Sequence, residues 1–208
     1  MLVLMIALAL KASERPGEWN GNFAPCDEHF ELQKRGRMNV GVRFSISSGE
    51  RAAAYGRALT FWAAILDMTW GTTDSSSCAM QFIDADPRMF RPAEVARAQF
   101  PEAASFQGWI LVNPARKLAE REWFLTAVHE IGHLLGLQHN RNTASAMYYL
   151  AVDGSKFLDL ADLAALAARH KLRKEVLTCM ARGEGSFRLP AGCQCIHEGG
   201  SISILLPD

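Results

Sequence analysis

Two histidines and one glutamate near the middle of the chain have the spacing of a metal-dependent hydrolytic site. His129 and His133 are four residues apart, and residues at that spacing on an α-helix point to the same side, one turn apart. Both rings can therefore bind one metal ion. Glu130 is rotated by about 100° from His129, which puts its carboxylate beside the ion instead of on it.

A glycine explains how a third histidine reaches the same ion. Gly136 can adopt a positive φ, so the helix can end there and the chain can turn back, bringing His139 round. Three neutral imidazoles suit Zn²⁺ and leave a position for water, which is typical of a catalytic site. The alternative is a helix with surface histidines and a glycine cap, but the pattern H-E-x-x-H-x-x-G-x-x-H rarely arises by chance.

The motif resembles that of the metzincin metallopeptidases, and most closely that of the matrixin catalytic domains. Residues 145–148 look like the Met-turn of that family, and Met147 follows His139 at a short, matrixin-like interval. Residues 95–101 are similar to the Ala-His-Ala-x-x-Pro stretch of the matrixin edge strand, with Arg97 in place of the histidine. Residues 108–113 lie where the family has its last strand before the zinc helix.

This resemblance implies a secreted zinc endopeptidase with one catalytic Zn²⁺ bound by His129, His133 and His139. Such an ion lowers the pKa of its bound water and polarises the scissile carbonyl. Glu130 would take the proton from that water as general base and deliver it to the leaving amine as general acid. The family's methionine, here Met147, forms an apolar floor beneath the histidines, a role close to ordinary core packing.

Tyr149 is the second candidate catalytic residue. In the astacin and serralysin branches a tyrosine two residues after the methionine reaches the zinc and stabilises the oxyanion, whereas matrixins usually have proline there. The alternative role is an aromatic wall of the substrate pocket. The short interval between His139 and Met147 favours the wall.

The resemblance also implies how substrate binds. An extended peptide would pair with the edge strand predicted at 95–100, where backbone hydrogen bonds give affinity and side-chain pockets give specificity. The alternative is a loop or edge that binds nothing. Two candidate calcium ligands, Asp84 and Asp86, stay unassigned because aspartates in loops more often cap turns.

The sequence departs from matrixins in two respects. Their structural zinc is held by histidines, but no histidine occurs between His29 and His129, so we expect that second zinc to be absent. Their latency depends on a long propeptide with a cysteine switch, and only 36 residues precede the resembling region here. Cys26 could cap the zinc as a thiolate, but its surroundings do not match the switch motif, and we favour a disulfide role.

The order of predicted elements indicates an α+β fold of the metzincin (zincin-like) type and not the even alternation of a Rossmann sheet. We expect a twisted mixed sheet with two long helices above an active-site cleft, and a small lower subdomain with a C-terminal helix. The predicted strands are residues 38–46, 68–70, 79–83, 95–100 and 108–113. The predicted helices are one after the turn at 47–50 that includes Tyr55, Leu59, Trp62, Ala63 and Leu66, then 119–135 and 157–170.

We divide the chain into four regions. Residues 1–12 begin with an apolar run, interpreted as a truncated secretory signal, with a frayed or partly buried strand as the alternative. Residues 13–36 are an N-terminal loop region, and residues 37–170 are the metzincin catalytic domain. Residues 171–208 are a cysteine-containing extension, in which the apolar run at 202–206 indicates an added strand.

Composition limits the partners and the location. The formal net charge is zero, so nothing indicates nucleic acid as a partner. The apolar start is too short for stable membrane insertion, and we expect a monomer that is secreted, extracellular or periplasmic. The five cysteines then allow up to two disulfides and one remaining thiol, with a connectivity that the sequence does not reveal.

Two other functions stay open. One is a catalytically silent metzincin-fold binding protein, although such a protein has no need of the carboxylate of Glu130. The other is a zinc hydrolase that acts on a non-peptide amide or on one terminus of a peptide, because pocket shape decides specificity.

Overall fold

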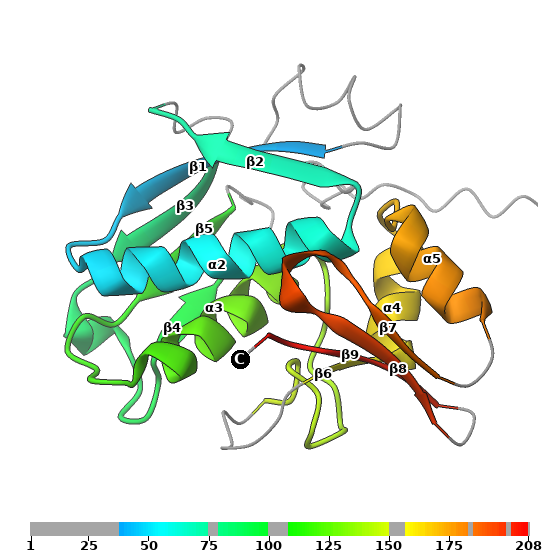
Figure 1. Cartoon of the computed structure of the whole chain (residues 1–208). Helices are drawn as coiled ribbons and strands as arrows, with labels where there is room; N and C mark the ends of the chain where they lie inside the picture. The colour runs from blue at the N-terminus through cyan, green and yellow to red at the C-terminus, as the bar shows by residue number, and fades with distance from the viewer. Residues whose placement is uncertain are drawn as a thin grey trace, which may run out of the picture.

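The computed structural model describes residues 38–74, 79–99, 108–149, 157–182, 185–198 and 201–207. These residues form two β-sheets with helices between them (Figure 1). The regions predicted at 1–12 and 13–36, including Cys26, lie outside the described residues. No helix in the described part of the chain is both long and apolar enough to cross a membrane.

The first sheet has the mixed character predicted for it. Its strands follow the order β2-β1-β3-β5-β4, in which β4 is antiparallel to β5 and the other pairs are parallel. The strands are β1 (Met38–Ser45), β2 (Met68–Thr72), β3 (Ala79–Asp84), β4 (Ala96–Ala98) and β5 (Trp109–Val112). Strand β4 is therefore an edge strand, as predicted, although it is shorter than residues 95–100.

Two long helices pack together on this sheet, α2 (Gly49–Ile65) and α3 (Glu120–Leu134). Ser48 caps the start of α2, where its hydroxyl accepts a hydrogen bond from Arg51 N–H. The apolar stripe predicted for α2 is buried, and Trp62 donates its indole N–H to the Val128 carbonyl of α3 at 3.2 Å. This contact fixes α3 against α2 in the turn that carries His129.

The lower part contains a short strand where the sequence indicated only helix. Residues 157–170 were predicted to be one helix, but Phe157–Asp159 form β6, and α4 spans Leu160–Ala167. The Asp159 carboxylate caps α4 by accepting hydrogen bonds from the backbone N–H groups of Ala161 and Asp162, each at 3.0 Å. The helix cannot extend back through its own cap, so the prediction was wrong for these three residues.

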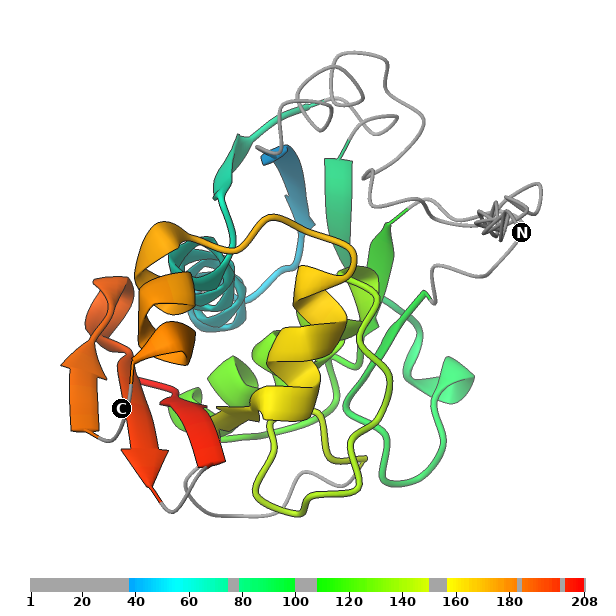
Figure 2. The same cartoon turned by 90° about the vertical axis from the view of Figure 1, so that its right-hand side faces the viewer.

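The C-terminal region builds a second sheet in the antiparallel order β6-β9-β8-β7. Its strands are β7 (Gly185–Arg188), β8 (Gln194–Glu198) and β9 (Ser201–Leu205), and helix α5 (Lys174–Ala181) precedes them. Short 3₁₀ turns occur at Pro87–Met89 and Pro190–Gly192. The strand predicted near 202–206 is thus present as β9, and Figure 2 shows this sheet beside α4 and α5.

A buried histidine joins the lower part to the end of α3. The Nε2–H group of His170 donates a hydrogen bond to the Leu135 carbonyl at 2.8 Å, because a carbonyl oxygen can only accept. Burial lowers the pKa of His170 to about 4, an effect that the bond to Leu135 opposes. His170 is therefore neutral in the folded protein at neutral pH.

Acid should destabilise the protein through His170. The unfolded chain takes up a proton near pH 6.5, while the folded chain resists protonation down to about pH 4. The contribution of His170 to the free energy of unfolding should therefore stay constant above pH 6.5 and fall by roughly 3 kcal/mol between pH 6.5 and pH 4. Urea unfolding of the wild type and of His170→Gln across this range should show a shallower loss in the variant. An equally steep loss in both would contradict the assignment, and Lys174→Gln, a change at an exposed residue, is the control.

Candidate active site

The three predicted histidines come together in space. Each offers one ring nitrogen, and these atoms all lie within 4.8 Å of one another. The ring centroids of His129 and His133 are 4.6 Å apart, and those of His133 and His139 are 4.7 Å apart. His129 and His133 belong to α3, whereas His139 comes from the chain that follows it.

The turn at Gly136 brings His139 into this group. Gly136 has a φ of 88°, a left-handed conformation that suits glycine. The Leu137 N–H group donates to the Gly132 carbonyl and the Gly136 N–H group to the His133 carbonyl, each at 2.9 Å. This is the Schellman pattern of helix termination, and it reverses the chain as the sequence predicted.

Backbone carbonyls orient two of the rings. His129 Nδ1 lies 2.8 Å from the Ala146 carbonyl, and His133 Nδ1 lies 2.8 Å from the Leu137 carbonyl. Because carbonyls only accept, both Nδ1 atoms carry the proton, and in a neutral ring Nε2 then presents a lone pair. The two Nε2 atoms face each other at 3.0 Å, an arrangement that suits a shared cation.

Burial favours the neutral form of these ligands. Desolvation, together with the neighbouring His129, lowers the pKa of His133 to about 3. Desolvation also lowers the pKa of His139. A donor set of neutral imidazoles therefore fits Zn²⁺.

Glu130 connects the helix to the edge strand. One of its carboxylate oxygens accepts a hydrogen bond from Ala98 N–H of β4 at 2.7 Å. Burial raises the pKa of Glu130 to about 7, while the bond from Ala98 opposes this rise. The carboxylate of the residue next to His129 is thus bonded to β4, and its orientation depends on that strand.

Met147 packs tightly beneath α3. A Cβ atom on Gly132 would come within 2.5 Å of the Met147 sulfur and 3.2 Å of a Trp62 ring carbon. Only glycine permits this approach with the present packing. Met147 is fully buried, and its carbonyl accepts a hydrogen bond from Asn140 N–H at 2.8 Å. Met147 therefore packs against α3 at Gly132, the residue before His133.

A buried polar network that sequence reasoning missed holds the Met-turn. The Asp162 carboxylate of α4 accepts hydrogen bonds from the Ser145 hydroxyl at 2.8 Å and from the Asn140 side chain at 3.0 Å. Ser145 in turn accepts a bond from Met147 N–H at 2.9 Å. Burial raises the pKa of Asp162, and these hydrogen bonds lower it. The polar residues before and after the Met-turn were the feature of the sequence that could have indicated this network.

Tyr149 lies beside the histidines but is open to solvent. Its ring centroid is 6.5 Å from that of His139 and 4.6 Å from that of Tyr148. Its side chain is 59% exposed. The structure therefore brings Tyr149 to the rim of the site, next to the third histidine.

The remaining candidates form pairs of their own. Arg97 forms an ion pair with Glu94 at 2.7 Å. Asp84 accepts from Arg51 at 3.0 Å, and Asp86 pairs with Arg88. Cys179 and Cys195 form a disulfide, and Cys193 is buried and unbonded.

Residues 42–169 match the matrixin family, which covers more than half of the chain. The chain belongs to the matrixin family. Matrixins are zinc metallopeptidases, which agrees with the three-histidine group and with the α+β architecture of this matrixin. No curated protein matches the sequence.

Replacing Asp162 with asparagine should loosen the Met-turn of this matrixin. Oδ2 of Asp162 accepts from the Ser145 hydroxyl and from Asp159 N–H, and Oδ1 accepts from Asn140. An amide must turn a donor toward one of these donors, which should lower the free energy of unfolding by roughly 1.5–3 kcal/mol. Zinc affinity should fall about tenfold, since the Met-turn carbonyl of Ala146 orients His129.

Urea unfolding and competition with a chromophoric chelator measure the two effects. Asp86→Asn makes the same chemical change at an exposed carboxylate and should leave both quantities nearly unchanged. Equal changes in the two variants would show that Asp162 does not hold the turn.

Proposed function

We propose that this matrixin is a secreted zinc endopeptidase, active as a monomer on extended peptide segments. The observation that supports it most is the convergence of three imidazoles with a buried carboxylate beside an edge strand. A binding module would need neither Glu130 nor its bond to Ala98. An extracellular location agrees with the disulfide between Cys179 and Cys195.

His129, His133 and His139 would hold the zinc ion. The ion supplies Lewis acidity, which polarises a carbonyl and acidifies a coordinated water molecule. The protein fixes the ligands beforehand, because the Ala146 and Leu137 carbonyls orient two rings. This orientation determines which ring nitrogens bind the metal.

Glu130 would act as general base and then as general acid. Its carboxylate accepts the proton of the attacking water and passes it to the nitrogen of the leaving amine, so that the C–N bond breaks without releasing an amide anion. The bond from Ala98 N–H keeps one carboxylate oxygen fixed. The second oxygen would then accept the proton of the water.

The edge strand β4 supplies the backbone for substrate. Asn113 N–H donates to the Val95 carbonyl and Gln99 N–H donates to the Trp109 carbonyl, so alternate residues of this segment bond toward β5. The backbone groups of Ala96 and the carbonyl of Ala98 therefore point the other way, while Ala98 N–H is already bonded to Glu130. An extended peptide would pair there in the antiparallel sense, and Glu130 at Ala98 would set its register.

A zinc hydrolase for a non-peptide amide is the second candidate. The exposed Tyr149 at the rim favours neither substrate class. Mass-spectrometric mapping of cleavage in a peptide library, with and without a zinc chelator, separates the two candidates. Internal cleavage that the chelator abolishes supports an endopeptidase, and an uncleaved library would reject it.

The oxidised protein should bind one zinc ion. Metal analysis after zinc loading and desalting should give about one ion per chain, and His133→Ala should lose most of it, because this ligand is central to the group. His170→Gln is the matched control and should keep its zinc. Two ions in the oxidised protein would contradict the absence of a structural site, and unchanged binding in His133→Ala would reject the ligand assignment.

Glu130→Gln should keep zinc and lose hydrolysis. The amide can still accept from Ala98 N–H but cannot take a proton from water, so kcat/KM should fall by roughly 10²–10⁴-fold. Glu120→Gln, an exposed change on the same helix, should retain full activity. Comparable turnover in Glu130→Gln and wild type would mean that another group activates the water.

Tyr149→Phe separates an oxyanion role from a pocket wall. We expect kcat to change only a few-fold, since the ring is largely exposed and its centroid is 6.5 Å from that of His139. A hydrogen bond to the oxyanion would instead make kcat fall by roughly 10²-fold with little change in KM. Steady-state kinetics on one cleaved peptide decides between these roles.

A further inference from the structure

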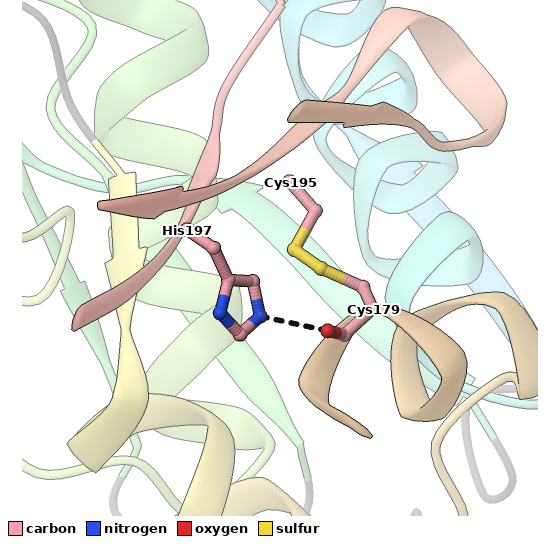
Figure 3. Close-up of a disulfide and its surroundings, with 3 residues drawn as sticks. All are labelled: Cys179, Cys195 and His197. Atoms are coloured by element: carbon pink, nitrogen blue, oxygen red, sulfur yellow. Dashed lines mark hydrogen bonds between the residues drawn. A yellow bond between two sulfur atoms is a disulfide. The ribbon is translucent and has the colours of Figure 1, made fainter. Parts of the chain in front are cut away.

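A second group of metal-ligating side chains lies far from the histidine triad in sequence. Cys179, Cys195 and His197 each offer one ligand atom, and these atoms lie within 4.8 Å of one another. Cys179 and Cys195 are joined as a disulfide that links α5 to β8. Figure 3 shows the His197 ring beside this bond.

The local fold explains why the three residues meet. Cys195 and His197 are two residues apart on β8, so both side chains leave the same face of the strand. Helix α5 packs against that face and contributes Cys179. The Nε2–H group of His197 donates a hydrogen bond to the Cys179 carbonyl at 2.7 Å, which holds the imidazole at the sulfur atoms.

We propose that Cys179, Cys195 and His197 form a redox-dependent binding site for a thiophilic divalent cation such as Zn²⁺. In the oxidised protein the two cysteines form the disulfide. A dithiol reductant gives up two electrons and two protons and becomes a disulfide itself, which converts Cys179 and Cys195 to thiols. The cation then displaces both thiol protons to solvent, and His197 contributes a nitrogen lone pair.

Two thiolates and one imidazole are a donor set that Zn²⁺ favours, with one position left for water. The two cysteines are 1% and 0% exposed, and their Cα atoms are 6.4 Å apart. A cation would therefore cross-link the same two elements as the disulfide. The C-terminal sheet would stay tied to α5 in a reducing as well as an oxidising environment.

The surroundings agree with this assignment. Cys179 lines a groove of about 470 Å³ together with Thr178 and Ser186, so one residue of the disulfide borders a solvent-filled hollow. The remaining cysteine of the C-terminal region, Cys193, does not belong to the group. Burial raises the pKa of the Cys193 thiol to about 12, so it stays protonated.

Cobalt binding to the full-length protein tests the proposal. Co²⁺ bound by thiolate gives a near-ultraviolet charge-transfer band, whereas Co²⁺ at the three histidines has no sulfur ligand and gives none. Protein reduced with a phosphine in the absence of oxygen should develop the band with one extra equivalent of Co²⁺, and oxidised protein should not. A reduced protein without the band would overturn the proposal.

Three variants locate the site. Cys195→Ser should abolish the band, and His197→Gln should weaken Co²⁺ binding at least about tenfold. Cys193→Ser is the matched control and should keep both band and affinity. Should Cys195→Ser fail to fold, His197→Gln still decides, because it leaves every cysteine in place. A band that survives unchanged in His197→Gln, or that disappears in Cys193→Ser, would reject the assigned ligands.

Discussion

Two hydrogen bonds from imidazole to backbone carbonyl are the constraint on which the site depends. The carbonyl of Leu137 orients His133, and the carbonyl of Ala146 orients His129. Neither carbonyl belongs to α3. Each is supplied by a chain reversal after the helix, so the tautomer and the direction of both rings are set by residues that never touch the metal.

The first reversal depends on a local property, and the second depends on distant residues. Gly136 can end α3 because its φ of 88° costs glycine little. The Met-turn has no such residue and is instead held by Asp162, through Ser145 and Asn140. A buried carboxylate that accepts several hydrogen bonds fixes the turn in one arrangement, since the buried Ser145 hydroxyl would lose this acceptor in another. Helix α4 thereby becomes part of the support for His129.

The sequence predicted the residues of the candidate metal site better than the residues that hold them in place. The spacing of His129, His133 and Gly136 follows from helix geometry. That geometry relates residues only a few positions apart, so it can be recognised from a short stretch of sequence. Strand β6 was missed because Phe157–Asp159 are extended by pairing with β9, more than forty residues later, and by a bridge from Phe157 to Ser145. Asp162 was missed for a similar reason. An aspartate in the first turn of a helix looks like an ordinary capping residue until the Met-turn is seen against it.

Helix α5 and strands β7 and β8 were not predicted, because the local sequence pattern of these segments is weak. The burial pattern of β8 alternates only partly, and its one buried residue is Cys195, whose disulfide partner lies in α5. What fixes these strands is pairing with β9 and the cross-link to α5. Because β9 also pairs with β6, and the residue after β6 begins the helix that carries Asp162, the C-terminal sheet borders the same network that holds the Met-turn. The order of the metal site therefore rests partly on strands that lie outside the region matched to the matrixin family.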